Sequence, residues 1–263
     1  MFVLIQKCLP KHLLSRIIGW IAASENSVIK TLFIHIFSLF YTINLAEAER
    51  ENKSDYVSFN DFFTRALKPG ARPVSGLICS PADGTVAAFG TINNNTIIQS
   101  KNHDYSVSAL LAEDTNDFDG GSFITIYLAP YNYHRVHVPK TAELHAARYI
   151  PGDLFSVNLN TAENLPDLFA RNERLACRFR TGDGPMAEVL VGAMLVAGIK
   201  PAWLDRAYKP QLDIKTEMKR VFQQAEELGQ FEMGSTVILL FNKPVNFGVS
   251  VGDAVQVGQS LIR

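Results

Sequence analysis

The pattern of apolar and polar positions divides the chain near residue 54. Between residues 13 and 21 the apolar side chains recur at helical spacing and form a broad stripe that includes Trp20. A second apolar stretch, residues 28–45, would rise about 27 Å as a helix, slightly less than a bilayer core of about 30 Å. The polar run at residues 47–53 follows, and we expect it to be a solvated connector. The pattern therefore predicts two helices and a polar link.

Both predicted helices suit a membrane surface. Basic residues such as Lys11 and Arg16 lie among the apolar ones, no acidic residue precedes Glu25, and tryptophan favours the membrane interface. A helix spanning the bilayer would have to bury Lys30, at a cost of up to about 3 kcal/mol. We therefore expect two amphipathic helices lying on or partly in a membrane. A spanning helix and a helical pair packed on its own domain are the alternatives.

From residue 55 onward, short apolar runs alternate with Gly, Pro, Asn and Asp, which is typical of a β-rich body. Strands are expected at residues 85–89, 123–128 and 237–241. Helices are expected at residues 60–66, 107–112 and 216–228, the second with Ser106 as its N-cap. Residues 249–261 alternate small apolar residues with Gly-containing turns, as hairpins of barrel-sandwich folds do.

The predicted fold class is α+β, with a β-rich, barrel-sandwich-like core preceded by N-terminal amphipathic, membrane-associating helices. Two regions are expected, a helical one at residues 1–54 and a catalytic domain at residues 55–263.

Composition narrows the function classes. The 263 residues include 25 basic and 26 acidic side chains, so there is no overall basic field and nucleic acid is not an expected partner. A hydrophobic fraction of 47% excludes general disorder. Cys8, Cys79 and Cys177 are too few and too scattered for a disulfide framework or a zinc site, so we expect them to fill apolar space in a reducing compartment.

Three local clusters carry side chains suited to catalysis. Asp83 lies in a Pro/Gly turn before a strand, where an Asx turn alone would explain it. His134 and His137 are three residues apart, so on an extended chain they point to opposite faces and suit two separate proton transfers. Without a third ligand, this pair is weak grounds for zinc, and no metal is expected. Gly234 and Ser235 lie in a turn that enters a strand.

Asp83, His137 and Ser235 therefore all lie at turn-to-strand junctions. Such a set is compatible with a triad in which a base activates a hydroxyl, and only geometry identifies a triad, because chain order varies among convergent ones. The sequence contains no Gly-x-Ser-x-Gly elbow, which argues against an α/β-hydrolase.

An ordered set of motifs spanning nearly the whole chain resembles the phosphatidylserine decarboxylase family. The motifs are Phe59-Asn60-Asp61-Phe62-Phe63-x-Arg65, Arg72-Pro73, Pro81-Ala82-Asp83-Gly84, Tyr133-His134-Arg135-Val136-His137, Pro151-Gly152-Asp153-Leu154-Phe155-Ser156-Val157-Asn158, Ala170-Arg171-Asn172-Glu173-Arg174, Val191-Gly192-Ala193 and Gly234-Ser235-Thr236.

The resemblance implies a self-cleaving, membrane-associated enzyme. Cleavage between Gly234 and Ser235 would give a β chain of residues 1–234 and an α chain of residues 235–263, with a covalent pyruvoyl group derived from Ser235. It implies that His137, oriented by Asp83, is the base for cleavage. It also suggests His134 as the group that protonates the α-carbon after carbon dioxide leaves, and Ser156 as a head-group contact.

The implied reaction converts phosphatidylserine to phosphatidylethanolamine and carbon dioxide in phospholipid biosynthesis, through a Schiff base to the pyruvoyl group and without an external cofactor. The implied setting is peripheral, on the cytoplasmic face of the cell membrane. The α and β chains would stay associated, and the resemblance allows a homo-oligomer of the cleaved pair.

Two features qualify the resemblance. Asn132 stands where many relatives have aspartate, which leaves Asp83 as the expected carboxylate partner of the histidine. Residues 171–174 have two open interpretations, salt-bridged structural support and head-group phosphate binding.

Three other functions remain as alternatives. They are a pyruvoyl decarboxylase of a soluble amino acid, an uncleaved lipid-binding scaffold and a serine hydrolase.

Overall fold

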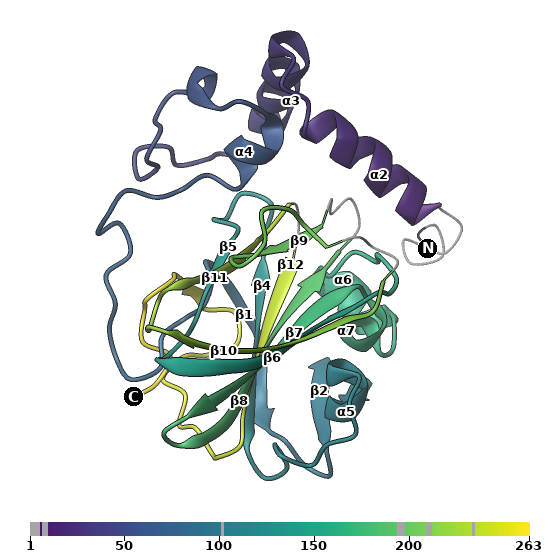
Figure 1. Ribbon diagram of the computed structural model, residues 1–263, viewed down its shortest axis with the longest axis vertical. Coiled ribbons are helices and arrows are strands. Elements are labelled where there is room, and N and C mark those ends of the chain that lie inside the picture. Colours follow the sequence, from purple (N-terminus) through teal and green to yellow (C-terminus); the bar gives the residue numbers. More distant parts are fainter. Residues whose placement is uncertain (1–5, 7–9, 101–102, 194–197, 209–211, 233–234) are drawn as a thin grey trace.

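An antiparallel sheet of eight strands forms the centre of the protein, in the order β10-β6-β7-β8-β12-β4-β1-β13 (Figure 1). The computed structural model describes residues 6, 10–100, 103–193, 198–208, 212–232 and 235–263. The strands of the large sheet are β1 Gly84–Thr91, β4 Ser122–Leu128, β6 Ala142–Ile150, β7 Arg174–Thr181, β8 Gly184–Gly192, β10 Ile214–Phe222, β12 Ser235–Phe241 and β13 Ala254–Val255. The smaller sheets contain β5 Arg135–His137, β9 Ile199–Pro201 and β11 Glu227–Phe231, and β2 Thr96–Ser100 with β3 His103–Ser106.

The large sheet is buried on both faces. Along β12 the side chains alternate between two apolar cores, with Val237 and Leu239 in one and Ile238 and Leu240 in the other. The first core is closed by the three-stranded sheet, and the second is covered by the β2–β3 pair and short helices (Figure 1). These helices are α5 Val107–Leu111, α6 Leu159–Asn164 and α7 Leu168–Arg171. The α+β, β-rich prediction is confirmed.

The N-terminal region contains two helices, as predicted, and they pack on a small third core. They are α2 Lys11–Ala22 and α3 Ser27–Phe40, and they are followed by the short turn η1 Lys53–Asp55 and by α4 Phe59–Phe63. The side chain of Asn26 caps α3 by accepting hydrogen bonds from two backbone N–H groups. Phe37 of α3 lies edge-on to Phe59 and Phe63 of α4, with ring centroids 5.3 and 5.9 Å apart.

No single helix among the described residues has both the length and the apolar character needed to cross a membrane. Helices α2 and α3 satisfy that test only as a pair, and their axes bend by 115° at the junction.

The polar run at residues 47–53 is held more tightly than predicted. Arg50 makes two hydrogen bonds to the Asp61 carboxylate, at 2.5 and 2.6 Å, and Glu47 forms an ion pair with Arg72 at 2.9 Å. Ala48 is fully buried. The run is therefore fixed against the rest of the protein and is not a solvated connector, because its charged side chains form ion pairs with Asp61 and Arg72.

Two of the three helices predicted in the body are present, and the prediction of the third is wrong. The side chain of Ser106 caps α5 as expected, and α4 is a shorter version of the helix predicted at residues 60–66. Residues 216–228 instead contribute to β10 and β11. Good helix formers crowd this segment, but half-buried and exposed positions alternate with period two along β10, and pairing with β6 overrides local propensity.

One carboxyl group is enclosed in the first core. Glu188 lies in the middle of β8 between Cys177 of β7 and Leu239 of β12, is fully buried, and has neither oxygen hydrogen-bonded to any described residue. Burial raises its pKa well above the ordinary value of 4.5. In the folded protein the group is therefore a neutral carboxylic acid, while in the unfolded chain it ionises at ordinary pH.

This difference makes the Glu188 contribution to stability fall as pH rises above about 4.5, because the folded state keeps a proton that the unfolded state releases. We expect Glu188→Gln to become progressively more stable than wild type between about pH 5 and about pH 8, with a limiting slope of about 1.4 kcal/mol per pH unit. Urea unfolding of both proteins across that range is the measurement. The exposed Glu163→Gln is the control, and equal slopes for wild type and Glu188→Gln would contradict the assignment.

Candidate active site

Ser235 is the first residue of β12 and lies between the ends of two neighbouring strands. It pairs with Leu128 at the end of β4 and with Gly192 at the end of β8. Ser235 is fully buried, and its Oγ has no hydrogen-bond partner among the described residues. Residues 233 and 234 lie outside the described part of the chain, which includes the predicted cleavage residue Gly234. A buried, unpartnered hydroxyl is costly unless another group uses it, so this atom is the natural starting point of the site.

His134 lies in the segment that follows β4 and is fully buried. Its Nδ1 is 2.8 Å from the Asn132 carbonyl oxygen, and its ring lies 4.1 Å from that of Phe63, centroid to centroid. Its Nε2 has no partner among the described residues. Burial, aided by the nearby positive charge of Arg65, lowers the pKa of His134 to about 3. The imidazole is therefore neutral at pH 7, with one ring nitrogen free.

His137 has partners different from those of His134. Its Nδ1 is 2.8 Å from the Ala225 carbonyl oxygen, and its Nε2 is 3.1 Å from the hydroxyl of Tyr133, whose ring is stacked on the imidazole. Burial lowers the pKa of His137, so this ring too is neutral at pH 7, the state that a general base requires.

Asp83 does not hydrogen-bond to His137, contrary to expectation. Its carboxylate pairs with Arg72, at 2.5 Å for the shortest contact, and accepts the backbone N–H of Val257 at 2.8 Å. Arg72 also binds Glu47, so one guanidinium, on a side chain that is 9% exposed, joins two carboxylates. The sequence expectation failed because Arg72 takes the Asp83 carboxylate, while the Ala225 carbonyl, 88 residues from His137, takes its Nδ1. Burial lowers the His137 pKa, the hydrogen bond to the Ala225 carbonyl is the main effect opposing it, and the charge of Asp83 is only a minor contribution in the same direction.

The expected carboxylate at position 132 is replaced by an amide with a different function. The Asn132 side-chain oxygen accepts the Ala129 N–H at 2.8 Å and closes the turn after β4, while the Asn132 backbone carbonyl binds His134. The backbone thus supplies the histidine partner that a side chain could have supplied.

Ser156 lies away from these contacts. Its backbone N–H donates to the Gln6 side chain at 2.8 Å, and its Oγ accepts a long hydrogen bond from Asn158 at 3.5 Å. The same segment meets the start of α2, where Lys11 lies 3.3 Å from Asp153 and 3.2 Å from the centre of the Phe155 ring. Ser156 therefore belongs to a junction between the β body and the N-terminal helices.

The Arg171–Arg174 motif supports the structure around the end of β8. Asn172 donates to the Phe155 and Gly192 carbonyls, and Arg174 donates to two carbonyls at the end of α5 and to the Asn172 carbonyl. Arg171 pairs with Asp153 at 3.1 Å. These bonds fit the structural-support interpretation. Burial raises the pKa of the intervening Glu173 to about 7.

Cys79 and Cys177 are buried and free, in agreement with the prediction that they fill apolar space, whereas Cys8 lies outside the described residues. Within the described ranges, no group of three or more His, Cys, Asp or Glu side chains could hold a metal ion.

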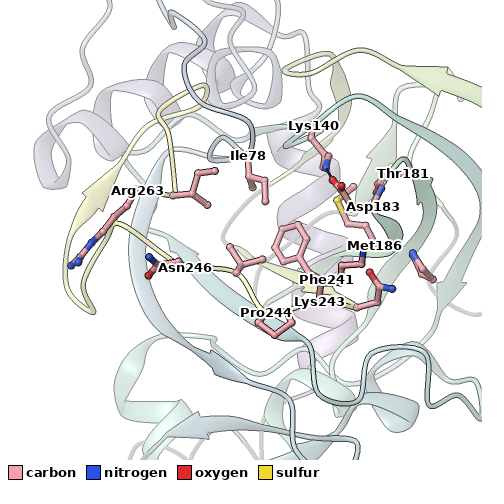
Figure 2. A pocket seen from close by; sticks show the side chains of 14 residues that line it. Ile78, Lys140, Thr181, Asp183, Met186, Phe241, Lys243, Pro244, Asn246 and Arg263 are labelled. Atoms are coloured by element: carbon pink, nitrogen blue, oxygen red, sulfur yellow. Dashed lines mark hydrogen bonds and ion pairs between the residues drawn. The ribbon is translucent and has the colours of Figure 1, made fainter.

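A cavity of about 320 Å³ lies at the other end of β12. Phe241, the last residue of that strand, lines it together with Met186, and the Lys140–Asp183 ion pair lies beside them (Figure 2). Strand β12 has seven residues, so this end lies six residue steps, about 20 Å, from the Ser235 end. This cavity is therefore distinct from the site around Ser235.

Two family models match different parts of the chain. A family model described as phosphatidylserine decarboxylase matches residues 59–263, and a model described as PSD matches residues 1–41. The chain belongs to the phosphatidylserine decarboxylase family. Curated phosphatidylserine decarboxylase proenzymes resemble it closely. The protein of Alcanivorax borkumensis is 48% identical, over 92% of this chain and 87% of the relative. That of Pseudomonas putida strain F1 is 47% identical over 99% and 96%, and that of Shewanella pealeana is 46% identical over 99% and 97%.

Within this family framework, sequence reasoning missed three groups around the two histidines: Tyr133 and the Ala225 carbonyl, which bind His137, and Arg65, which shares the Asn132 carbonyl with His134. Arg65 and Tyr133 lie inside motifs that carry the resemblance, but their residue types alone gave no role. The Ala225 carbonyl had no sequence signal, because any residue supplies a backbone oxygen. Arg65 and Tyr133 could have been found by asking which motif residues are buried and polar.

Proposed function

We propose that the chain is a phosphatidylserine decarboxylase proenzyme that cuts its own backbone between Gly234 and Ser235 and then decarboxylates phosphatidylserine. The observation that carries the proposal is the buried Ser235 hydroxyl at the start of β12, which has no hydrogen-bond partner among the described residues, in a family whose curated relatives are proenzymes. A hydroxyl without a hydrogen-bond partner is free to be deprotonated and to attack a neighbouring carbonyl carbon.

Self-cleavage would begin when Ser235 Oγ attacks the Gly234 carbonyl carbon and His137 takes the hydroxyl proton. The C–N bond then breaks, the Ser235 nitrogen accepts a proton, and an ester replaces the amide. Removal of the Ser235 α-proton expels the ester as a carboxylate at Gly234. The dehydroalanine left at position 235 tautomerises to an imine, and water hydrolyses it with release of ammonia. The products are residues 1–234 and a 29-residue chain, 235–263, that begins with a pyruvoyl group.

The residues around Ser235 fit such a group. The Ser235 position is fully buried and flanked by two strand ends, which would exclude water from a reactive carbonyl. When formed, the pyruvoyl group supplies an electron-accepting carbonyl for carbon dioxide loss, as pyridoxal phosphate does in other enzymes. The chain itself supplies the neutral imidazole of His134, which we assign to proton transfer at the substrate α-carbon. Ser156 remains the weaker candidate for a head-group contact.

The two cleaved chains are expected to stay together. After cleavage β12 would still be paired with β4 and β8 along its full length, and Val257 of the short chain would still donate to Asp83 of the long one. A homo-oligomer of this pair is compatible with the proposal.

The N-terminal helices are proposed to bring the site to a membrane, on its cytoplasmic face. Large apolar side chains protrude from α2 and α3. They are Leu13, Ile17, Trp20, Val28, Leu32, Ile36, Leu39 and Phe40. On each helix they recur three or four residues apart and so share one face. An apolar helical face with nearby basic residues is the pattern of a helix that lies in the interface plane.

Trp20 offers the sharpest test of membrane binding, since its side chain is 76% exposed. We expect Trp20→Ser to weaken binding to phosphatidylserine-containing vesicles about 10- to 100-fold, because burying one large apolar side chain contributes about 1.5–3 kcal/mol. Vesicle co-sedimentation measures the effect. The matched control is Ile98→Ser on β2, which is also exposed but outside the helices and should bind like wild type. Equal vesicle binding by both variants would show that Trp20 of α2 does not contribute to membrane binding.

The substrate is tested by carbon dioxide release from phosphatidylserine vesicles and from free serine. Release from the lipid alone supports the proposal. Release from free serine at a similar rate would favour the soluble amino-acid decarboxylase, and no release with an uncut chain would favour the scaffold.

A further inference from the structure

Arg65 is a buried cation with no acidic partner among the described residues. The residue is 2% exposed, and no described carboxylate lies within 4.0 Å of its guanidinium. It donates instead to the carbonyl oxygens of Tyr131 and Asn132, at 3.2 and 3.3 Å. Its Nε has no described partner. Burying a guanidinium in this way is costly, which suggests that the position serves the site.

The Asn132 carbonyl receives two donors. Arg65 reaches it from the segment that follows α4, and His134 Nδ1 reaches it from the same loop as Asn132, at 2.8 Å. A carbonyl oxygen can accept two hydrogen bonds but cannot donate, so the nitrogen of His134 that faces it must carry the hydrogen. In the neutral ring the other nitrogen, Nε2, then bears the free lone pair, and it is the atom left without a partner.

The charge of Arg65 acts in the same direction. A fixed cation beside the imidazole disfavours a second positive charge, and it adds to the burial that lowers the pKa of His134. The Phe63 ring, which packs on the imidazole at 4.1 Å between centroids, adds no charge.

We propose that Arg65 is a positioning residue that, through the Asn132 carbonyl, keeps His134 protonated on Nδ1 and leaves Nε2 to carry a proton to the substrate α-carbon, a proton that the nearby Arg65 charge makes easy to release. This inference rests on the proposed function of His134. The substrate amine arrives as an ammonium ion and must lose one proton to become a nucleophile, and Nε2 takes that proton. After carbon dioxide leaves, the proton passes from Nε2 to the α-carbon. The product amine regains its own proton from solvent, and His134 is again neutral.

The tautomer is measurable without any turnover. In the uncleaved Ser235→Ala chain labelled with ¹⁵N-histidine, NMR distinguishes protonated from unprotonated ring nitrogens, and a second spectrum with His134→Gln assigns the signals. We expect a single His134 tautomer, protonated on Nδ1, between about pH 5 and about pH 8. Arg65→Met in the same background is expected to give a mixture of tautomers.

Two further variants make the result specific. Arg65→Lys keeps the positive charge but replaces the planar guanidinium, which donates to two carbonyls, with a single ammonium group. It is therefore expected to keep the ring neutral but with a weaker preference for one tautomer. It is also the measured variant if Arg65→Met fails to fold. Arg135→Met is the matched control, because Arg135 donates to the neighbouring Thr64 carbonyl rather than to Asn132, and it should retain the single tautomer. A single Nδ1-protonated tautomer in both Arg65 variants would overturn the proposal.

Kinetics of the cleaved enzymes separate this inference from the proposed function. For Arg65→Met we expect kcat to fall about 10-fold at nearly constant KM, less than the roughly 10²- to 10⁴-fold that removal of a general acid–base group costs. If the tautomer changes while kcat does not, Arg65 positions His134 but the proposed role of His134 is wrong. If His134→Gln is inactive while the tautomer is unchanged in both Arg65 variants, the proposed function stands and the Arg65 inference fails.

Discussion

Ser235→Ala is expected to remain a single chain of 263 residues without decarboxylase activity. Alanine keeps the β12 pairing with β4 and β8 and removes only the hydroxyl that would attack the Gly234 carbonyl. Because the wild-type Oγ has no described hydrogen-bond partner, its loss should cost little stability. Denaturing gel electrophoresis and carbon dioxide release from phosphatidylserine vesicles measure the two effects.

Thr236 provides the matched control for this variant. Its hydroxyl is also buried and unpartnered, one residue further along β12. Thr236→Val removes that hydroxyl at constant shape and is expected to cleave. Cleavage of Ser235→Ala would show that another residue starts the reaction, and loss of cleavage in Thr236→Val would show that both hydroxyls are needed.

Replacement of the two histidines is expected to separate the two reactions. His137→Ala should abolish self-cleavage, since it removes the base assigned to Ser235. His134→Ala should still cleave and then decarboxylate about 10²- to 10⁴-fold more slowly, because it removes the group assigned to proton transfer at the α-carbon. The distinct partners of the two rings, Ala225 and Tyr133 for one and Asn132 for the other, support separate roles.

The measurement is the fraction cleaved and then the turnover rate of the cleaved fraction. His145→Ala, a change of a histidine on β6, is the control and should behave like wild type in both. Full activity of His134→Ala would show that His134 is not the proton-transfer group. An uncut His134→Ala chain would show that His134 is also needed for self-cleavage.

Elements with strong local signals were predictable from the sequence. The strand at residues 237–241 is a continuous apolar run that is buried on both faces, and Ser106 lies where a helix cap must lie. The structure of residues 216–228 was not predictable in this way. Its residues favour a helix locally, and they adopt strands only through pairing with β6 and with β5 and β9. Contacts between distant segments overrode local preference there.

The same limit applied within the site. Ser235 and the two histidines were found from their residue types and their places at strand ends. The groups around the two histidines were not found, because the Ala225 carbonyl that binds His137 is 88 residues away from it, and Arg65 is 67 residues from the Asn132 carbonyl that His134 also binds. Pairing Asp83 with His137 was reasonable by chemistry, but a closer arginine takes the carboxylate.

The intact mass of the purified wild-type protein tests the central claim most directly, with Ser235→Ala beside it as the uncut reference. We predict two wild-type chains, residues 1–234 and residues 235–263, the shorter one lighter by one ammonia than simple hydrolysis of the Gly234–Ser235 bond would give. A single full-length mass for the wild-type protein would contradict the account.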